Sequence, residues 1–211
     1  MARVLCWSLL LLSAAPVRLL AGEAADLLGV MYWTDRTKGL YRAARDGSEI
    51  ELIVPRRFID SIAVDRKGGK LYWTAINGRF TQLWQGNLDG SEQIMLADDL
   101  KWVGDVAFDP VDKHVYVSSI AEAKVIRFNA DGTERTDFLV GIHKPSRLYV
   151  DVKQRKLYWA GHDQRRIDSI KLDGSDRQAV LENLPGVSFA FVIDPVERKI
   201  YWSFPRGAIY R

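Results

Sequence analysis

The sequence contains very little cysteine and histidine. Of its 211 residues only Cys6 is a cysteine, and the three histidines lie far apart at positions 114, 143 and 162. A chain without a second cysteine cannot form an internal disulfide, so packing must hold the fold together. The sequence also lacks the Gly-x-Ser-x-Gly, His-Glu-x-x-His and glycine-rich phosphate-binding motifs of enzymes. We therefore expect no catalysis, no metal and no cofactor.

Excess charge of one sign is also small, and long apolar runs are confined to the N-terminus. The 30 basic and 27 acidic residues leave a net charge of +3, too small to indicate a nucleic-acid partner. Residues 1–22 combine a positive start at Arg3, an apolar run and small residues from Ala21, which is typical of a secretory signal peptide. No run reaches the roughly 20 residues that span a membrane. We therefore expect residues 23–211 to be secreted, or to belong to the ectodomain of a receptor if the chain is truncated.

A repeat runs through the chain. Its marker is a tyrosine that is usually followed by tryptophan, and successive tyrosines are 40, 44, 42 and 43 residues apart. The marker tetrapeptides are Tyr32-Trp33-Thr34-Asp35, Tyr72-Trp73-Thr74-Ala75, Tyr116-Val117-Ser118-Ser119, Tyr158-Trp159-Ala160-Gly161 and Tyr201-Trp202-Ser203-Phe204. An Asp-Gly-Ser/Thr sequence and an aspartate seven residues before the tyrosine recur in phase. A period of about 40–45 residues with short strands and turns is typical of a four-stranded β-propeller blade.

The predicted fold class is therefore all-β, a propeller of four-stranded antiparallel blades. The tyrosine segments are predicted to be second strands, near residues 29–35, 70–75, 114–119, 156–160 and 199–204. Side chains alternate along a strand, so Tyr72 faces one neighbouring blade and Trp73 the other. Since both faces of a blade are covered, the tryptophans are predicted to be buried between blades: Trp33, Trp73, Trp159 and Trp202.

One unit matches a known repeat throughout its length. The sequences Ile62-Ala63-Val64-Asp65, Leu71-Tyr72-Trp73-Thr74 and Leu88-Asp89-Gly90-Ser91 resemble the low-density lipoprotein receptor class B repeat, also called the YWTD repeat, over about residues 28–211. In that family six repeats form a six-bladed propeller, usually followed by an epidermal-growth-factor-like module. A propeller that directly follows a signal peptide is most similar to the Wnt co-receptor subgroup. Only the first repeat here keeps the full tetrapeptide, ending at Asp35.

The chain is short for that family. About 4.4 periods follow Leu28, whereas six blades need roughly 250 residues. The first unit begins at its second strand and the last one stops inside its third strand. We therefore expect residues 23–211 to form a partial propeller, from a truncated isoform, a fragment or a shortened gene model. A fragment without a function of its own stays an open alternative.

A second alternative is a secreted propeller hydrolase of the metal-dependent lactonase type. Carboxylates around a propeller axis can hold a metal ion, and an aspartate ends each predicted first strand: Asp65, Asp109, Asp151 and Asp194. Recurrence in every unit favours a shared turn role, because a catalytic site needs different residues in different roles.

The leading hypothesis is an extracellular protein-binding module. In propellers of this family, loops that join blades share one face with turns between second and third strands. Five residues in these segments are predicted to contact a protein ligand: Phe58, Trp102, His143, Arg147 and Arg165. Trp102 is the candidate anchor, since tryptophan and arginine are enriched at binding hot spots; closing the end of its blade is its alternative role. On the opposite face, basic residues including Lys113, Arg155 and Arg198 are predicted to form a solvated rim, with weak binding of acidic glycans as its alternative role.

Overall fold

The computed structural model describes residues 29–161, 164–184, 190–204 and 209–211. Within these ranges lie eighteen strands in five antiparallel sheets. This part of the chain contains no helix that is long and apolar enough to cross a membrane. The predicted signal peptide, residues 1–22, lies outside the described residues.

Each sheet is made of strands that are consecutive in sequence. The first sheet contains β1 (Met31–Asp35), β2 (Gly39–Ala43) and β3 (Glu51–Val54). The second contains β4 (Ile59–Asp65), β5 (Lys70–Asn77), β6 (Phe80–Asn87) and β7 (Ile94–Leu100). The third contains β8 (Val103–Asp109), β9 (His114–Ser119), β10 (Lys124–Asn129) and β11 (Thr136–Val140). The fourth contains β12 (Pro145–Asp151), β13 (Lys156–Gly161), β14 (Ile167–Lys171) and β15 (Gln178–Leu181), and the fifth contains β16 (Ala190–Ile193), β17 (Ile200–Ser203) and β18 (Ile209–Tyr210).

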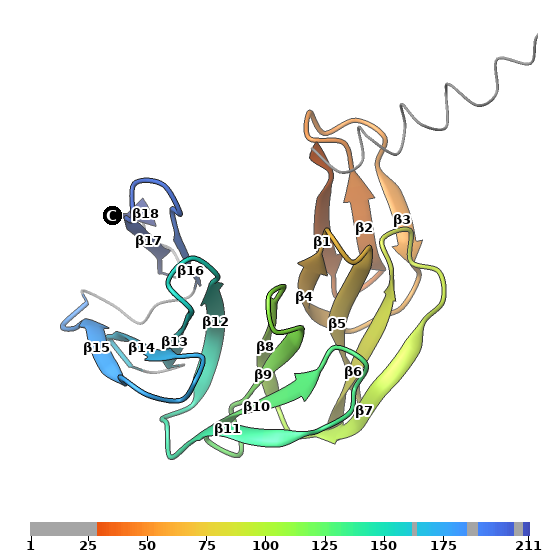
Figure 1. Ribbon diagram of the computed structural model, residues 1–211. Coiled ribbons are helices and arrows are strands. Elements are labelled where there is room, and N and C mark those ends of the chain that lie inside the picture. Colours follow the sequence, from red (N-terminus) through yellow and green to blue (C-terminus); the bar gives the residue numbers. More distant parts are fainter. Residues whose placement is uncertain (1–28, 162–163, 185–189, 205–208) are drawn as a thin grey trace, which may run out of the picture.

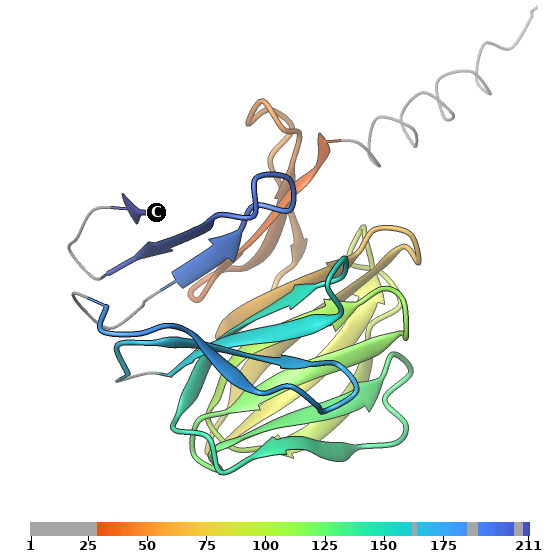
Figure 2. The same ribbon diagram turned by 60° about the vertical axis from the view of Figure 1, so that its left-hand side comes forward.

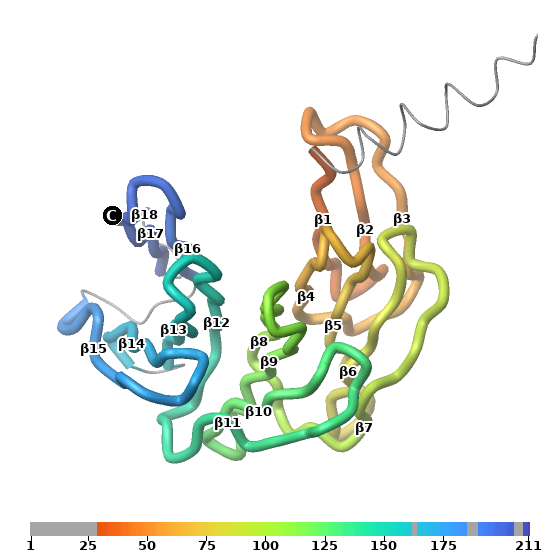
Figure 3. Tube along the Cα trace, viewed as in Figure 1, coloured from red at the N-terminus to blue at the C-terminus, as the bar shows by residue number. Residues whose placement is uncertain are grey.

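The five sheets lie along an open arc, as blades of a propeller do (Figure 1). The leading strands of neighbouring sheets contact one another: β1 on β4, β4 on β8, β8 on β12 and β12 on β16. The chain trace shows the same open arc, with the first and fifth sheets at its two ends (Figure 3). In the turned view both end sheets lie on the same side of the three middle sheets (Figure 2). The predicted all-β propeller with four-stranded antiparallel blades is confirmed.

A hydrophobic cluster lies between each pair of neighbouring sheets. Between the second and third sheets, the ring of Tyr72 stacks on Phe108 with 5.0 Å between the ring centroids. Between the first and second sheets, Trp73 packs with Leu40 and Val54. Tyr72 and Trp73 therefore face opposite blades, as the alternation of side chains along β5 predicts.

The four tryptophans that follow the marker tyrosines are not equally buried. The exposed fractions of Trp73 and Trp159 are 0% and 1%, whereas Trp33 and Trp202 are half-buried. The prediction of burial between blades is thus wrong for Trp33, whereas Trp202 packs against the cluster between the fourth and fifth sheets but is only partly buried there. Trp33 faces away from the second sheet, and Trp202 lies in a sheet that has three strands in the described part of the chain.

Candidate functional site

The segments that join successive sheets lie on one face of the arc, which we name the connecting face. It carries residues 55–58, 101–102 and 141–144, together with the turns between second and third strands. The turns between first and second strands and the Asp-Gly turns lie on the opposite face, which we name the Asp-Gly face. This division follows from the strand order, because successive turns of an antiparallel sheet alternate between its two ends.

Each of these three joining segments ends in a residue with a positive φ angle. Phe58, Trp102 and Lys144 have φ angles of 65°, 40° and 39°, and each directly precedes the first strand of a sheet. Ile76 N–H donates to the Phe58 carbonyl at 3.0 Å, and Ile120 N–H donates to the Trp102 carbonyl at 2.9 Å. Positive φ also recurs at equivalent turns of the Asp-Gly face, for example at Lys113 and Arg155, so it is a feature of the repeat and does not by itself mark a binding site. The fold holds three bulky residues in this conformation on one face.

Two of these three side chains are large, apolar and exposed. The exposed fraction is 58% for Trp102 and 47% for Phe58. The guanidinium of Arg57 lies 5.3 Å from the centroid of the Phe58 ring. Beside Trp102, the ammonium of Lys101 lies 3.6 Å from a carboxylate oxygen of Glu122. The connecting face thus exposes two aromatic rings beside cations, and among these residues Trp102 and Arg57 are of types that are enriched at binding hot spots.

The other three predicted contact residues divide between the surface and an inner strand. His143 is exposed in its joining segment. Arg165 lies in the turn after β13, and its Nε donates to the carbonyl of Leu184. Arg147 lies on β12 and not in a loop as expected, and its Nη1 donates to the Gly104 carbonyl at 2.9 Å. Four of the five predicted residues are therefore on the connecting face, and the fifth is on an inner strand.

A polar cluster that the sequence analysis missed joins three blades at their inner strands. Ser61 of β4, Asp105 of β8 and Arg147 of β12 share one position, four residues before the recurring aspartate. The Asp105 carboxylate accepts hydrogen bonds from the Ser61 hydroxyl, from Val106 N–H at 2.9 Å and from Leu148 N–H at 3.0 Å. Burial raises the pKa of Asp105, although these hydrogen bonds oppose the shift. The cluster ties the second, third and fourth blades together.

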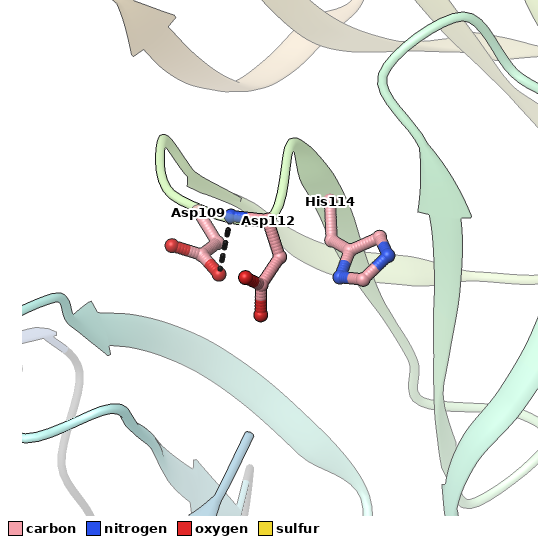
Figure 4. Close-up of side chains that lie close together, drawn as sticks. All are labelled: Asp109, Asp112 and His114. Atoms are coloured by element: carbon pink, nitrogen blue, oxygen red, sulfur yellow. Dashed lines mark hydrogen bonds between the residues drawn. The ribbon is translucent and has the colours of Figure 1, made fainter. Parts of the chain in front are cut away.

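Asp109, Asp112 and His114 form a compact group on the Asp-Gly face, with side-chain ligand atoms within 4.8 Å of one another (Figure 4). A cation from the next blade already binds this group. Nη1 and Nη2 of Arg155 donate to the two carboxylate oxygens of Asp109 at 2.8 and 2.9 Å, and Nη2 also donates to Asp112. Burial alone raises the pKa of Asp109, but the bonds from Arg155 and backbone N–H groups outweigh it and hold the pKa below its usual value.

The same type of ion pair recurs between other blades. Lys113 Nζ lies 3.0 Å from Asp65 Oδ2, and Arg198 Nη2 lies 2.6 Å from Asp151 Oδ2. The aspartates are buried and also accept backbone hydrogen bonds within their own turns, as expected. Lys113 is exposed, as a solvated rim predicts, although it also pairs with Asp65, whereas the prediction is wrong for Arg155 and Arg198, which are half-buried against aspartates of the preceding blade. The sequence signal was a cation three residues before three of the marker tyrosines.

Comparisons with known proteins agree with this architecture. No family profile matches the chain. The chain is 30% identical over 188 residues to low-density lipoprotein receptor-related protein 5 of Mus musculus, which covers 82% of this chain and 11% of that protein. Among solved structures, a chain of the nidogen/laminin complex matches 82% of this chain and 69% of its own length, with a TM-score of 0.72 and 18% identity. The chain is a propeller of low-density lipoprotein receptor class B repeats.

Two further matches extend the comparison of this class B propeller. Protein cueball of Drosophila erecta is 27% identical over 106 residues, covering 47% of this chain and 16% of that protein. A gluconolactonase of Xanthomonas campestris has the same fold, with a TM-score of 0.68 and 19% identity over 82% of this chain and 65% of that chain. The class B propeller thus spans about a tenth of receptor-related protein 5 and a sixth of this cueball protein.

The gluconolactonase match makes it necessary to test the inner strands for a metal site. At the position shared by Ser61, Asp105, Arg147 and Ala190, the class B propeller offers a hydroxyl, one carboxylate, a guanidinium and a methyl group. Hard divalent cations take six or more oxygen ligands, several of them carboxylates. One carboxylate beside an arginine does not fit such an ion, so this position gives the hydrolase alternative no metal site.

Proposed function

We propose that this class B propeller is an extracellular module that binds a protein ligand on its connecting face and performs no catalysis. The observation that carries the proposal is Trp102, with 58% of its surface exposed and a φ angle of 40° where the second blade joins the third. A tryptophan buries about 150–250 Å² when it is covered, so covering the exposed part of Trp102 contributes roughly 2–3 kcal/mol. Phe58, His143 and Arg165 are proposed to extend the same contact surface.

Three observations support this role. The sequence similarity to lipoprotein receptor-related protein 5 and the structural match to a chain of the nidogen/laminin complex both favour protein binding. The signal-peptide pattern of residues 1–22 favours export. The resemblance to the Wnt co-receptor subgroup makes Wnt proteins one candidate ligand class. An adjoining epidermal-growth-factor-like module in a longer chain also belongs to this proposal.

The test is binding of the purified chain to laminin and to Wnt proteins, measured by biolayer interferometry. Trp102→Ala is compared with Val111→Ala, since Val111 is also 58% exposed but lies on the Asp-Gly face. We expect Trp102→Ala to weaken binding by about 30-fold, the effect of a hot-spot residue, while Val111→Ala leaves binding unchanged. Equal binding by both variants would exclude the connecting face.

The second candidate function is a lactone hydrolase, and the match to the gluconolactonase fold favours it. We expect no lactone hydrolysis by the purified chain. Hydrolysis that is lost on addition of a chelator and restored by a divalent cation would favour the hydrolase over the binding module.

A further inference from the structure

One arginine of the connecting face stands where the repeat otherwise places a buried aliphatic residue. The position lies two residues before the positive-φ residues that precede β4, β8 and β12, and it is occupied by Arg56, Leu100 and Ile142. Leu100 and Ile142 are 0% and 2% exposed, whereas Arg56 is half-buried. The junction between the first and second sheets therefore holds a charge at a position that apolar packing fills in the next two junctions.

Two side chains of β6 hold the guanidinium of Arg56. Its Nη2 donates to Gln82 Oε1 at 2.6 Å, and its Cζ lies 4.3 Å from the centroid of the Trp84 ring. Trp84 Nε1 also donates to Gln82 Oε1, at 3.2 Å. Phe80, Gln82 and Trp84 share one face of β6, because side chains alternate along a strand. Arg56 therefore lies across a row of side chains that ends at Phe80, which is 45% exposed.

No carboxylate of the described residues pairs with this guanidinium. Burial alone lowers the pKa of Arg56, whereas an adjacent carboxylate would raise it. A half-buried cation loses part of its hydration, and an amide oxygen replaces that hydration less well than an anion does. The guanidinium has five N–H donors, and Gln82 accepts a hydrogen bond from one of them. Donors therefore remain for an anion that a ligand supplies.

Equivalent blades neutralise their half-buried cations within the chain. Lys124 Nζ lies 3.0 Å from Asp137 Oδ1 in the third blade. In the fourth blade, Arg166 Nε donates to both carboxylate oxygens of Asp168 at 2.9 Å, and this carboxylate raises the pKa of Arg166. The pKa of Arg56 is shifted in the opposite direction. Arg56 thus differs from these cations in having an amide where they have a carboxylate.

The surroundings of Arg56 fit an acidic peptide segment. Arg57 follows it in sequence, and Arg79 lies in the turn before β6. Both arginines are exposed, so they add positive potential that attracts an acidic segment. Phe80 offers an apolar contact at the end of the same row. A sulfated glycan binds an array of exposed cations, whereas the central cation here is half-buried against aromatic surface. One carboxylate with an apolar neighbour is the better fit.

We propose that Arg56 is an anion site of the connecting face, which binds a carboxylate of the protein ligand while Phe80 contacts the apolar residue beside that carboxylate. This inference rests on the proposed function, because it names the chemistry of a ligand on the same face. The site lies at the same end of the second blade as Trp102. Thr81, next to Gln82, pairs with Leu100, and Trp102 follows two residues later.

Selection from a phage library of random linear heptapeptides tests the site without a known ligand. The purified chain is expected to retain peptides that are enriched in aspartate or glutamate. The tightest binder, synthesised with a fluorescein label, then serves as the probe, and fluorescence polarisation measures its Kd. Arg56→Gln is expected to weaken binding of this probe by about 10- to 100-fold, the effect of losing a hydrogen-bonded charge pair.

Arg177→Gln is the matched control. The guanidinium of Arg177 lies 5.5 Å from the centroid of the Trp159 ring, so it is also an arginine over a tryptophan, but it lies on the Asp-Gly face. This variant is expected to bind the probe as the wild-type chain does. Arg56→Lys keeps the charge and loses the fork of donors, so its affinity is expected to lie between those of the wild-type chain and Arg56→Gln.

A double-mutant cycle shows whether Arg56 contacts the acidic residue directly, and it does not depend on the stability of one variant. Changing each acidic residue of the probe to its amide in turn identifies the one that binds. That change is expected to weaken binding to the wild-type chain by the same 10- to 100-fold or so and to leave binding to Arg56→Gln unchanged. Equal losses on both chains, or selected peptides without acidic residues, would overturn the anion site.

Two further outcomes separate this inference from the proposed function. A probe that depends on Trp102 but not on Arg56 would overturn the anion site and keep the proposed function. A probe that depends on Arg56 but not on Trp102 would support the anion site and contradict Trp102 as the anchor. Heparin binding that Arg56→Gln abolishes, with no acidic peptide retained, would assign the site to a sulfated glycan and overturn the inference.

Discussion

At the scale of single residues, ion pairs between blades show how buried charge is held in this fold. Asp109 is 0% exposed, and its carboxylate is matched by the fork of Arg155 from the following blade. A buried carboxylate without a partner loses its hydration and gains no compensating interaction, so it destabilises the fold. The pair therefore links the third and fourth blades, because each blade supplies one of the two charges.

Replacing Arg155 with methionine is expected to lower the free energy of unfolding at neutral pH by about 2–3 kcal/mol, less than for a fully buried pair because the guanidinium is partly exposed. Arg155→Lys is the matched control, because the equivalent Lys113 pairs with Asp65 at 3.0 Å. The lysine variant is expected to keep more than half of the lost stability. Urea unfolding measures both, and equal losses would contradict a charge-pairing role.

The same variant has a defined pH dependence. The pKa of Asp109 is lowered in the folded chain, so its ion pair stabilises the fold above the unfolded pKa of about 3.9 and loses this effect as the pH falls through the folded pKa. Asp105 has a raised pKa, so its contribution has the opposite sign and is lost as the pH rises. The free energy of unfolding of Arg155→Met is therefore expected to fall less between neutral and acid pH than that of the wild-type chain.

At the scale of elements, the Asp-Gly turns combine local hydrogen bonding with contact between blades. Asp89 Oδ1 accepts hydrogen bonds from the backbone N–H and the hydroxyl of Ser91, at 2.9 and 2.6 Å. The Gly90 φ angle of 81° suits glycine, and a Cβ there would lie 2.2 Å from the Ile53 carbonyl oxygen of the first sheet. Gly174 has a φ angle of 90° but no atom within 4 Å of such a Cβ.

Gly90→Ala and Gly174→Ala form a matched pair that separates these two requirements. Gly174→Ala is expected to cost about 1 kcal/mol, from the positive φ angle alone. Gly90→Ala is expected to cost at least about 2 kcal/mol more, because the first and second sheets must move apart. Thermal unfolding of both variants measures the difference. Equal losses of stability would mean that the first and second sheets can move apart at no cost in free energy.

The sequence predicts the elements of this fold better than the contacts between them. The period of the tyrosines and the Asp-Gly turns indicates the strands and their order, because both signals are local. The positive φ angles of Phe58 and Trp102 carry no local signal, since neither residue type favours that conformation. The cluster of Ser61, Asp105 and Arg147 was missed because its members come from three different blades, and only their equal distance from the recurring aspartates connects them.

At the scale of the whole molecule, the sheets differ in how many of their faces are covered. The second, third and fourth sheets each pack on two neighbours, and most residues of β5, β9 and β13 are buried. The first and fifth sheets each pack on one neighbour, and β1 and β17 contain no fully buried residue. Stability in a repeat protein is approximately a sum over repeats and the interfaces between neighbours. The end sheets therefore have the lowest local stability.

Native-state hydrogen exchange measures this difference directly. We expect the amides of β9 to exchange at least about tenfold more slowly than those of β1 and β17 in dilute solution, because opening an end sheet breaks one interface while opening the third sheet breaks two. Uniform exchange across all sheets would contradict the repeat description.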